Sequence, residues 1–356
     1  MMMRKFMLLL SVLGILMLCG CGGREIDDVA YVVAIGIDRM DGNYEFTFAI
    51  GNPDSINGEG EDPLVFESAV SGDIFTAGDE ISARVGQEVN FSHAELLVFS
   101  KEIALGGVNT FLDELTRNLD QRPKLIPAVA SGSAKETLQG VNSQFEGNPE
   151  KYLKKIFEYS ASPVSTGIDS RDFLCRTKNI NTGTALPKIT SDDGTTATSM
   201  AVFYGDRMIG EFKDLSSYKL LSGMGEQMNC DVNGLGSMHL NQRVPPNIRV
   251  RCEDVPKIDI TVILDASVNT RNPDISKDDL YLTAENVLRA RMLELLEFTS
   301  IDAGVDILGF ERYARKNFYT WDDWKEYEWC NRYGIAQFNL EVKLIPQKTG
   351  LVKGES

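Results

Sequence analysis

The sequence predicts a mixed α/β protein of the α+β kind, with three domains that each hold a small mixed or antiparallel sheet flanked by helices. Short apolar segments typical of strands alternate along the chain with segments of helical spacing, the order found where helices pack on sheets. A length of 356 residues suits two or three domains. A hydrophobic content of 43% beside 25% charged residues is ordinary for globular proteins, so each domain can bury a core.

The first 20 residues have the pattern of a bacterial lipoprotein signal peptide. A basic start and an apolar run are followed by Leu18, Cys19, Gly20 and Cys21. We expect cleavage before Cys21 and diacylation of the new N-terminus, because Cys19 follows a leucine where a small residue is needed. The apolar run is too short to span the roughly 30 Å core of a bilayer. The alternative is an ordinary secreted protein with a chance cysteine near its cleavage site.

An N-terminal domain is predicted over residues 21–190. Residues 29–37 are nearly continuous in apolar and β-branched side chains, as in a buried strand. Residues 44–50 alternate apolar and polar side chains, and Asp41-Gly42 between the two segments is a hairpin turn signal. The later elements expected are helices over 73–89, 101–119 with a break at Gly106-Gly107, 133–138 and 148–159, and strands over 94–99 and 125–130.

A middle domain is predicted over residues 191–255. The stretch 179–196 is rich in Thr, Asp and Gly, which is typical of a linker into this domain. Strands are expected over 200–203 and 208–212, because Gly205-Asp206 between them favours a tight turn. These two strands would form the β-hairpin of the middle domain.

A C-terminal α+β domain is predicted over residues 256–350, before a polar tail at 351–356. Residues 258–268 and 338–345 alternate with period two, as strands with one buried face do. Ser276 and Asp279 stand three apart before a long segment of helical spacing, which predicts a helix from Ser276 to Phe298. We expect this helix to lie on a sheet that contains both strands.

An aromatic cluster follows in the same domain. Trp321, Trp324, Tyr327 and Trp329 lie close together in the sequence. Such clusters more often pack a helix on a sheet than bind sugars or bases. We expect the cluster to cover an edge of the sheet, and Trp321 and Trp324 are the candidate partner contacts. A compact basic patch precedes the cluster: Arg312, Arg315 and Lys316.

The sequence holds no recognisable catalytic, cofactor or metal motif. Its two histidines, His93 and His239, are far apart, and no His/Cys cluster has metal-ligand spacing. A formal net charge of −16 repels phosphates, which argues against a nucleic-acid partner. We therefore expect no enzyme and no cofactor. Four cysteines follow Cys21 in the sequence: Cys175, Cys230, Cys252 and Cys330. They could be free thiols or form up to two disulfides, and the sequence favours neither.

Residues 24–30 and 32–38 open the mature chain, and several further segments follow them in order. Together they resemble one family, the Ger(x)C lipoproteins, which are the C subunits of bacterial spore germinant receptors. The order and spacing of the later segments fit as well. These are Asn52-Pro53, residues 92–99, 104–107 and 111–114, Arg122-Pro123, residues 201–203, 208–210 and 306–310, and Trp321 with Trp324.

The resemblance implies a three-domain lipoprotein anchored to the outer face of the cell membrane, which is the inner membrane of the spore. It would be a non-enzymatic subunit of a nutrient germinant receptor, required to initiate germination. Its partners would be the integral-membrane A and B subunits, and Cys21 would carry the lipid anchor. The alternative is an extracytoplasmic solute-binding lipoprotein of a transporter, which needs two similar lobes around a deep cleft.

Overall fold

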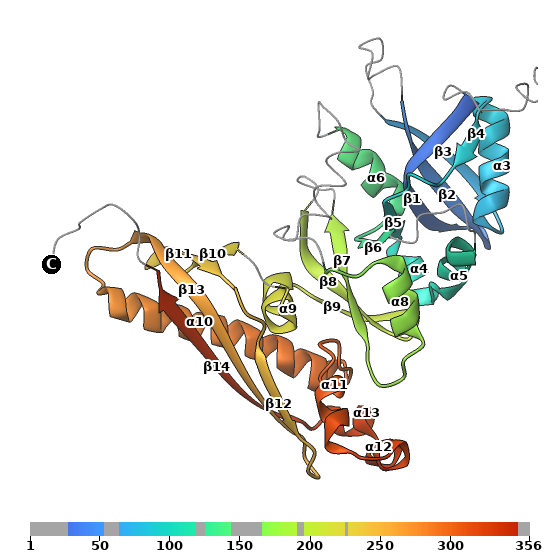
Figure 1. Cartoon of the computed structure of the whole chain (residues 1–356). Helices are drawn as coiled ribbons and strands as arrows, with labels where there is room; N and C mark the ends of the chain where they lie inside the picture. The colour runs from blue at the N-terminus through green and yellow to red at the C-terminus, as the bar shows by residue number, and fades with distance from the viewer. Residues whose placement is uncertain are drawn as a thin grey trace, which may run out of the picture.

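The computed structural model describes residues 28–52, 64–117, 125–143, 166–190, 196–224 and 227–347. Within these ranges the strands form one sheet of nine strands and one of five, and each sheet is flanked by helices (Figure 1). The predicted mixed α+β class is confirmed. The described strands fall into two sheets, however, and not into one sheet for each of three domains. The predicted signal peptide, Cys21 and the tail lie outside the described residues.

The first sheet has the order β3-β2-β1-β5-β6-β7-β8-β9, with β4 paired to β1. Its centre is parallel, from β1 through β5 and β6 to β7, and the outer pairs are antiparallel. The strands are β1 (Val29–Met40), β2 (Asn43–Gly51), β3 (Leu64–Ser71), β4 (Glu88–Asn90), β5 (Leu96–Phe99), β6 (Ile126–Ala130), β7 (Thr184–Thr190), β8 (Thr196–Tyr204) and β9 (Arg207–Phe212).

The predicted hairpin between β1 and β2 is confirmed. Asp41 and Gly42 form its turn with φ angles of 47° and 84°, the left-handed pair that matches the twist of the flanking strands. Strand β1 is buried over most of its length, because helices cover both faces of the sheet there. This explains why residues 29–37 are almost uninterrupted in apolar side chains.

Helices α3, α4, α5 and α8 pack on one face of the first sheet, and α6 packs on the other. The break expected at Gly106-Gly107 within the helical segment 101–119 is confirmed, because Gly107 has a φ of 120° and ends the first of two helices. The helix expected over 148–159 lies outside the described residues. The bounds are α3 (Ile74–Val85), α4 (Lys101–Gly106), α5 (Asn109–Arg117), α6 (Ala134–Ser143) and α8 (Ser170–Thr177).

The segment expected to be a linker, 179–196, contains strand β7, so this prediction was wrong. Strand β7 pairs with β6 on one side and β8 on the other, so both of its edges are hydrogen bonded although the wider stretch 179–196 is polar. The predicted hairpin of β8 and β9 is confirmed, but it extends the first sheet. The middle segment 191–255 therefore contributes strands to both sheets, and its limits as a separate domain stay a prediction.

The second sheet is built around the long strand β13 (Lys257–Arg271). Strand β14 (Gln337–Pro346) lies parallel to it, and α10 (Lys277–Glu297) packs along β14 (Figure 1). Ser276 caps α10 by accepting a hydrogen bond from the backbone N–H of Asp279, as predicted. The prediction of a long helix on a sheet of these two strands is confirmed. The other strands are β10 (Gln227–Asp231), β11 (Gly236–Asn241) and β12 (Asn247–Arg251).

One hydrophobic core runs from the end of the first sheet into the second. Met200 and Phe212 from β8 and β9 belong to the same buried cluster as the apolar face of α10. The short helix α9 (Leu215–Ser222) lies between the sheets, and its capping residue Asp214 makes two hydrogen bonds of 2.9 Å to Arg291 of α10. The two sheets, each with its helices, form two lobes. A continuous core and the ion pair of Asp214 with Arg291 hold these lobes together.

Candidate interaction surface

The described residues show no constellation typical of a catalytic or metal centre. Among them, no three His, Cys, Asp or Glu side chains gather closely enough to hold a metal ion. His93 packs its ring on Tyr31 with centroids 4.6 Å apart, and His239 lies on the exposed side of β11 with Nδ1 3.2 Å from Asn229 Oδ1. Within the same ranges no helix has the length and apolarity needed to span a bilayer.

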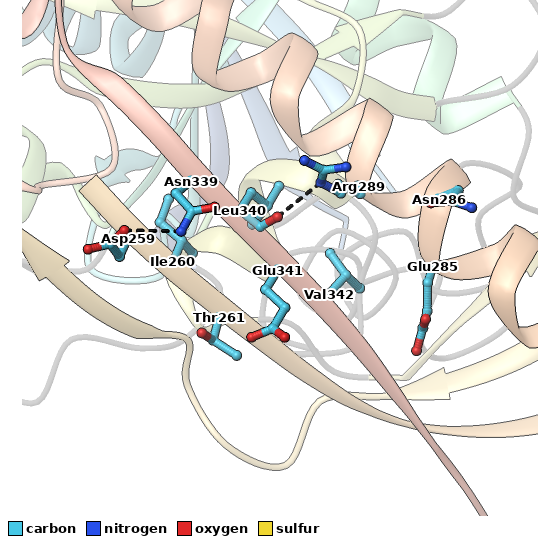
Figure 2. Close-up of a pocket in the computed structure, with 10 residues that line it drawn as sticks. All are labelled: Asp259, Ile260, Thr261, Glu285, Asn286, Arg289, Asn339, Leu340, Glu341 and Val342. Carbon is cyan, nitrogen blue, oxygen red and sulfur yellow. Dashed lines mark hydrogen bonds between the residues drawn. The ribbon is translucent and has the colours of Figure 1, made fainter. Parts of the chain in front are cut away.

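A polar hollow of about 480 Å³ lies where α10 passes β14 (Figure 2). Two side chains of α10 bond the outer edge of β14 there. Arg289 Nε donates to the carbonyl of Leu340 at 3.0 Å, and Glu285 accepts from the backbone N–H of Leu344 at 2.8 Å. Covering a sheet edge in this way prevents it from pairing with another strand. The polar groups of the hollow therefore serve the fold.

The predicted aromatic cluster closes one end of the second sheet. Its short helices are α11 (Glu311–Ala314), α12 (Trp321–Tyr327) and α13 (Trp329–Tyr333), with a 3₁₀ turn at Arg315–Asn317. Trp324 and Trp329 are 2% and 1% exposed, and their ring centroids are 6.2 Å apart. Phe318 packs on Trp324 with centroids 5.5 Å apart. Trp324 is thus a core side chain and offers no free surface to a partner.

Trp321, the other candidate contact, lies at the surface. It is 54% exposed, because it projects from a side of α12 next to the buried face. Two cations lie over its ring, with Arg315 Cζ at 5.3 Å and Lys325 Nζ at 5.9 Å from the centroid. Its neighbour Tyr319 is fully exposed. The sequence could not separate Trp321 from Trp324, because a spacing of three places both near one face of a helix.

A second ring of the same segment, Tyr313, carries two more cations. Arg312 Cζ lies 5.0 Å and Lys316 Nζ 5.2 Å from the centroid of Tyr313. The basic patch noticed in the sequence is therefore interleaved with aromatic rings in space. We call the whole set the Trp321 surface: Arg312, Tyr313, Arg315, Lys316, Tyr319, Trp321 and Lys325.

A buried carboxylate, Asp306, bonds to the aromatic cluster through Trp329. Its side chain accepts hydrogen bonds from the backbone N–H groups of Gly309 and Glu311, each at 2.7 Å, and from Trp329 Nε1 at 3.3 Å. Burial raises the pKa of Asp306 to about 6, although these hydrogen bonds act to lower it. The sequence alone gave no sign that this Asp is buried. Asp306 fixes the start of α11 to the buried indole of α13.

The same region joins the two lobes. The backbone N–H of Gly183, just before β7, donates to the carbonyl of Asp306 at 3.0 Å. Asn179 and Asn181 donate to the carboxylate of Glu311 at 3.1 and 3.2 Å. A Cβ at Gly183 would lie 2.3 Å from Val305 Cγ1, so only glycine fits this contact. The segment before β7 is therefore docked on the C-terminal helices.

The raised pKa of Asp306 predicts a pH effect on stability. Because the folded chain binds this proton more tightly than an unfolded chain does, the group's contribution to stability falls as pH rises from about 4 through 6. In Asp306→Asn this loss disappears. The variant should therefore gain stability relative to wild type by up to about 3 kcal/mol between about pH 4 and pH 7.5.

Urea unfolding at both pH values measures this difference. Asp254→Asn is the control, because the side chain of Asp254 is fully exposed. An Asp306→Asn variant whose stability differs from wild type by the same amount at both pH values would contradict the assignment.

The four cysteines of the described residues are free thiols. Cys230 is buried, Cys252 and Cys330 are half-buried, and Cys175 is exposed. Burial raises the pKa of the Cys230, Cys252 and Cys330 thiols. Of the two alternatives left open by the sequence, the structure has free thiols.

Two family models together match nearly the whole chain. Residues 22–191 match the spore germination protein N-terminal domain, and residues 198–350 match the C-terminal domain described as spore germination B3/GerAC like. The boundary between them falls between the end of β7 and the first residues of β8.

Two curated proteins of Bacillus subtilis (strain 168) are similar in sequence. Spore germination protein KC is 29% identical over 170 residues, which is 45% of this chain and 42% of that protein. The putative spore germination protein YfkR is 26% identical over 228 residues, which is 58% of this chain and 57% of that protein. These alignments thus span about half the length of each relative.

One solved structure has a similar fold. The crystal structure of the GerBC protein superposes with a TM-score of 0.60 over 88% of this chain and 97% of that one. Sequence identity is 12%, so this similarity concerns the fold alone.

Proposed function

The chain belongs to the GerAC, or Ger(x)C, family of spore germination proteins, and from this premise we propose that it is the C subunit of a nutrient germinant receptor. In this role it initiates germination as part of a complex with integral-membrane A and B subunits. The match of both family domains, in order, along residues 22–191 and 198–350 carries the proposal. Spores that lack the chain are expected to lose the response to at least one nutrient.

The proposed role is that of a binding and assembly subunit, not an enzyme. The described residues lack a metal cluster, and the polar hollow beside β14 uses its charged side chains to cover a strand edge. A solute-binding role would need two similar lobes around a cleft. The described lobes differ instead, with nine strands in one sheet and five in the other. These observations favour the receptor role over the transporter alternative.

We place the chain on the outer face of the cell membrane, held by lipid on Cys21. The sequence supports this placement through the Leu-Cys-Gly-Cys ending of its signal peptide. At about 0.8 kcal/mol per buried methylene, two acyl chains suffice for stable anchoring. The acidic net charge of −16 makes attraction of the bare chain to anionic lipid unfavourable.

Cys21→Ala should therefore release the chain from the membrane. Fractionation of cells that express it without other receptor subunits measures the effect, and nearly all of the variant should be in the soluble fraction. Cys19→Ala is the matched control and should stay attached. A Cys21→Ala chain that remains in the membrane fraction would show that another attachment exists.

A further inference from the structure

The cations of the Trp321 surface are not neutralised by any carboxylate that the structure describes. Arg312, Arg315, Lys316 and Lys325 form no ion pair with any carboxylate of the described residues, although acidic residues outnumber basic ones by 52 to 36 in the chain. Other cations do find partners, as Arg291 does with Asp214. Four unneutralised charges in one place form a local positive site on an acidic protein, and such a site attracts negative charge.

The surface is also held in one arrangement. The cations lie over the rings of Tyr313 and Trp321, and Arg315 donates a hydrogen bond of 2.9 Å to the carbonyl of Phe318. Phe318 in turn packs on the buried Trp324. A pre-arranged surface loses less conformational entropy on binding, and Trp, Tyr and Arg are the residues that most often dominate interface energies.

Its accessible rings complete the case for an interface. Tyr319 is fully exposed and Trp321 is 54% exposed. Helix α12, which begins at Trp321, lies at the end of the second sheet where β14 begins (Figure 1). Large exposed aromatic side chains beside cations are typical of contacts to other molecules. We propose that the Trp321 surface docks an acidic segment of a partner protein.

The shape of the charge distribution favours a protein segment over a lipid surface. Lys325 is four residues from Trp321 and shares its side of α12. Successive residues of an α-helix are about 100° apart around its axis. The sides of α12 away from Trp321 and Lys325 therefore carry exposed acidic residues, which are Asp322, Asp323 and Glu326. A flat anionic bilayer would meet these acids as well as the cations, whereas a narrow acidic segment can follow the basic side alone.

This proposal deepens the proposed function and rests on it for the identity of the partner as a receptor subunit. The test places a photo-crosslinking amino acid at position 319 of the full chain in spores. Illumination should join it to a protein, at a segment rich in Asp and Glu. The double variant Arg315→Glu with Lys325→Glu should reduce the yield of this product about fivefold or more, because like charges repel across an interface.

Lys277→Glu is the matched control. Lys277 is an exposed cation at the start of α10, where a carboxylate suits the helix dipole, so its reversal should leave the yield unchanged. The double variant loses the hydrogen bond of Arg315 to Phe318 but should still unfold in urea in one cooperative transition from a folded state, which separates lost docking from lost folding. A product with lipid only, a product at a segment without acidic residues, no product at all, or an unchanged yield in the double variant would each overturn the proposal. If the acidic product forms while spores without the chain germinate normally, only the proposed function fails.

Discussion

Trp324→Ala should destabilise the chain by about 3 to 5 kcal/mol, as truncation of a large buried side chain does. Trp324 is 2% exposed and packs between Phe318, Tyr327 and Trp329, with ring centroids 5.5, 6.3 and 6.2 Å away. Alanine would leave a cavity in the middle of this cluster. Urea unfolding followed by circular dichroism measures the loss, in the Cys21→Ala background so that acyl chains play no part.

Trp321→Ala is the matched control for this result. Both are tryptophans of α12, but Trp321 is 54% exposed, so its truncation should cost about 1 kcal/mol or less. A Trp324→Ala variant with nearly the stability of wild type would contradict its place in the core. Equal losses in the two variants would contradict the division of the cluster into a buried base and an exposed surface.

Some elements were predicted correctly from the sequence. In these elements the local residue pattern indicates the same buried face that the packing in the structure uses. The strand–helix–strand unit of β13, α10 and β14 has period two, then a capped helix, then period two again, and each element buries one face. The hairpin at Asp41-Gly42 was predictable because its turn requires left-handed backbone angles that this pair adopts readily. In these places local chemistry is enough.

The predictions that failed depended on tertiary partners. Strand β7 is polar at both ends, and only its pairing with β6 and β8 makes it a strand. A sheet shared by distant segments likewise left no sign in the pattern of residues 191–255.

The candidate site was predicted in part for similar reasons. The aromatic spacing indicated a cluster on a helix, but which ring is buried depends on how α12 sits against Phe318 and Trp329. Arg315 contacts Trp321 from the segment before α12, which the sequence does not indicate, whereas Lys325 is four residues on in the same helix. Asp306 could not be recognised as buried, since its donors are backbone groups of Gly309 and Glu311 and these have no signature of their own.

The central claim is that the chain serves a receptor for nutrients in spore germination. The loss of optical density of a spore suspension after nutrient addition reports germination directly. Spores of a strain that lacks the chain should fail to respond to at least one nutrient of a panel of amino acids and sugars. Wild-type chain should restore the response, and Cys21→Ala should not. If spores without the chain respond to every nutrient as fast as the parent strain does, the receptor role is contradicted.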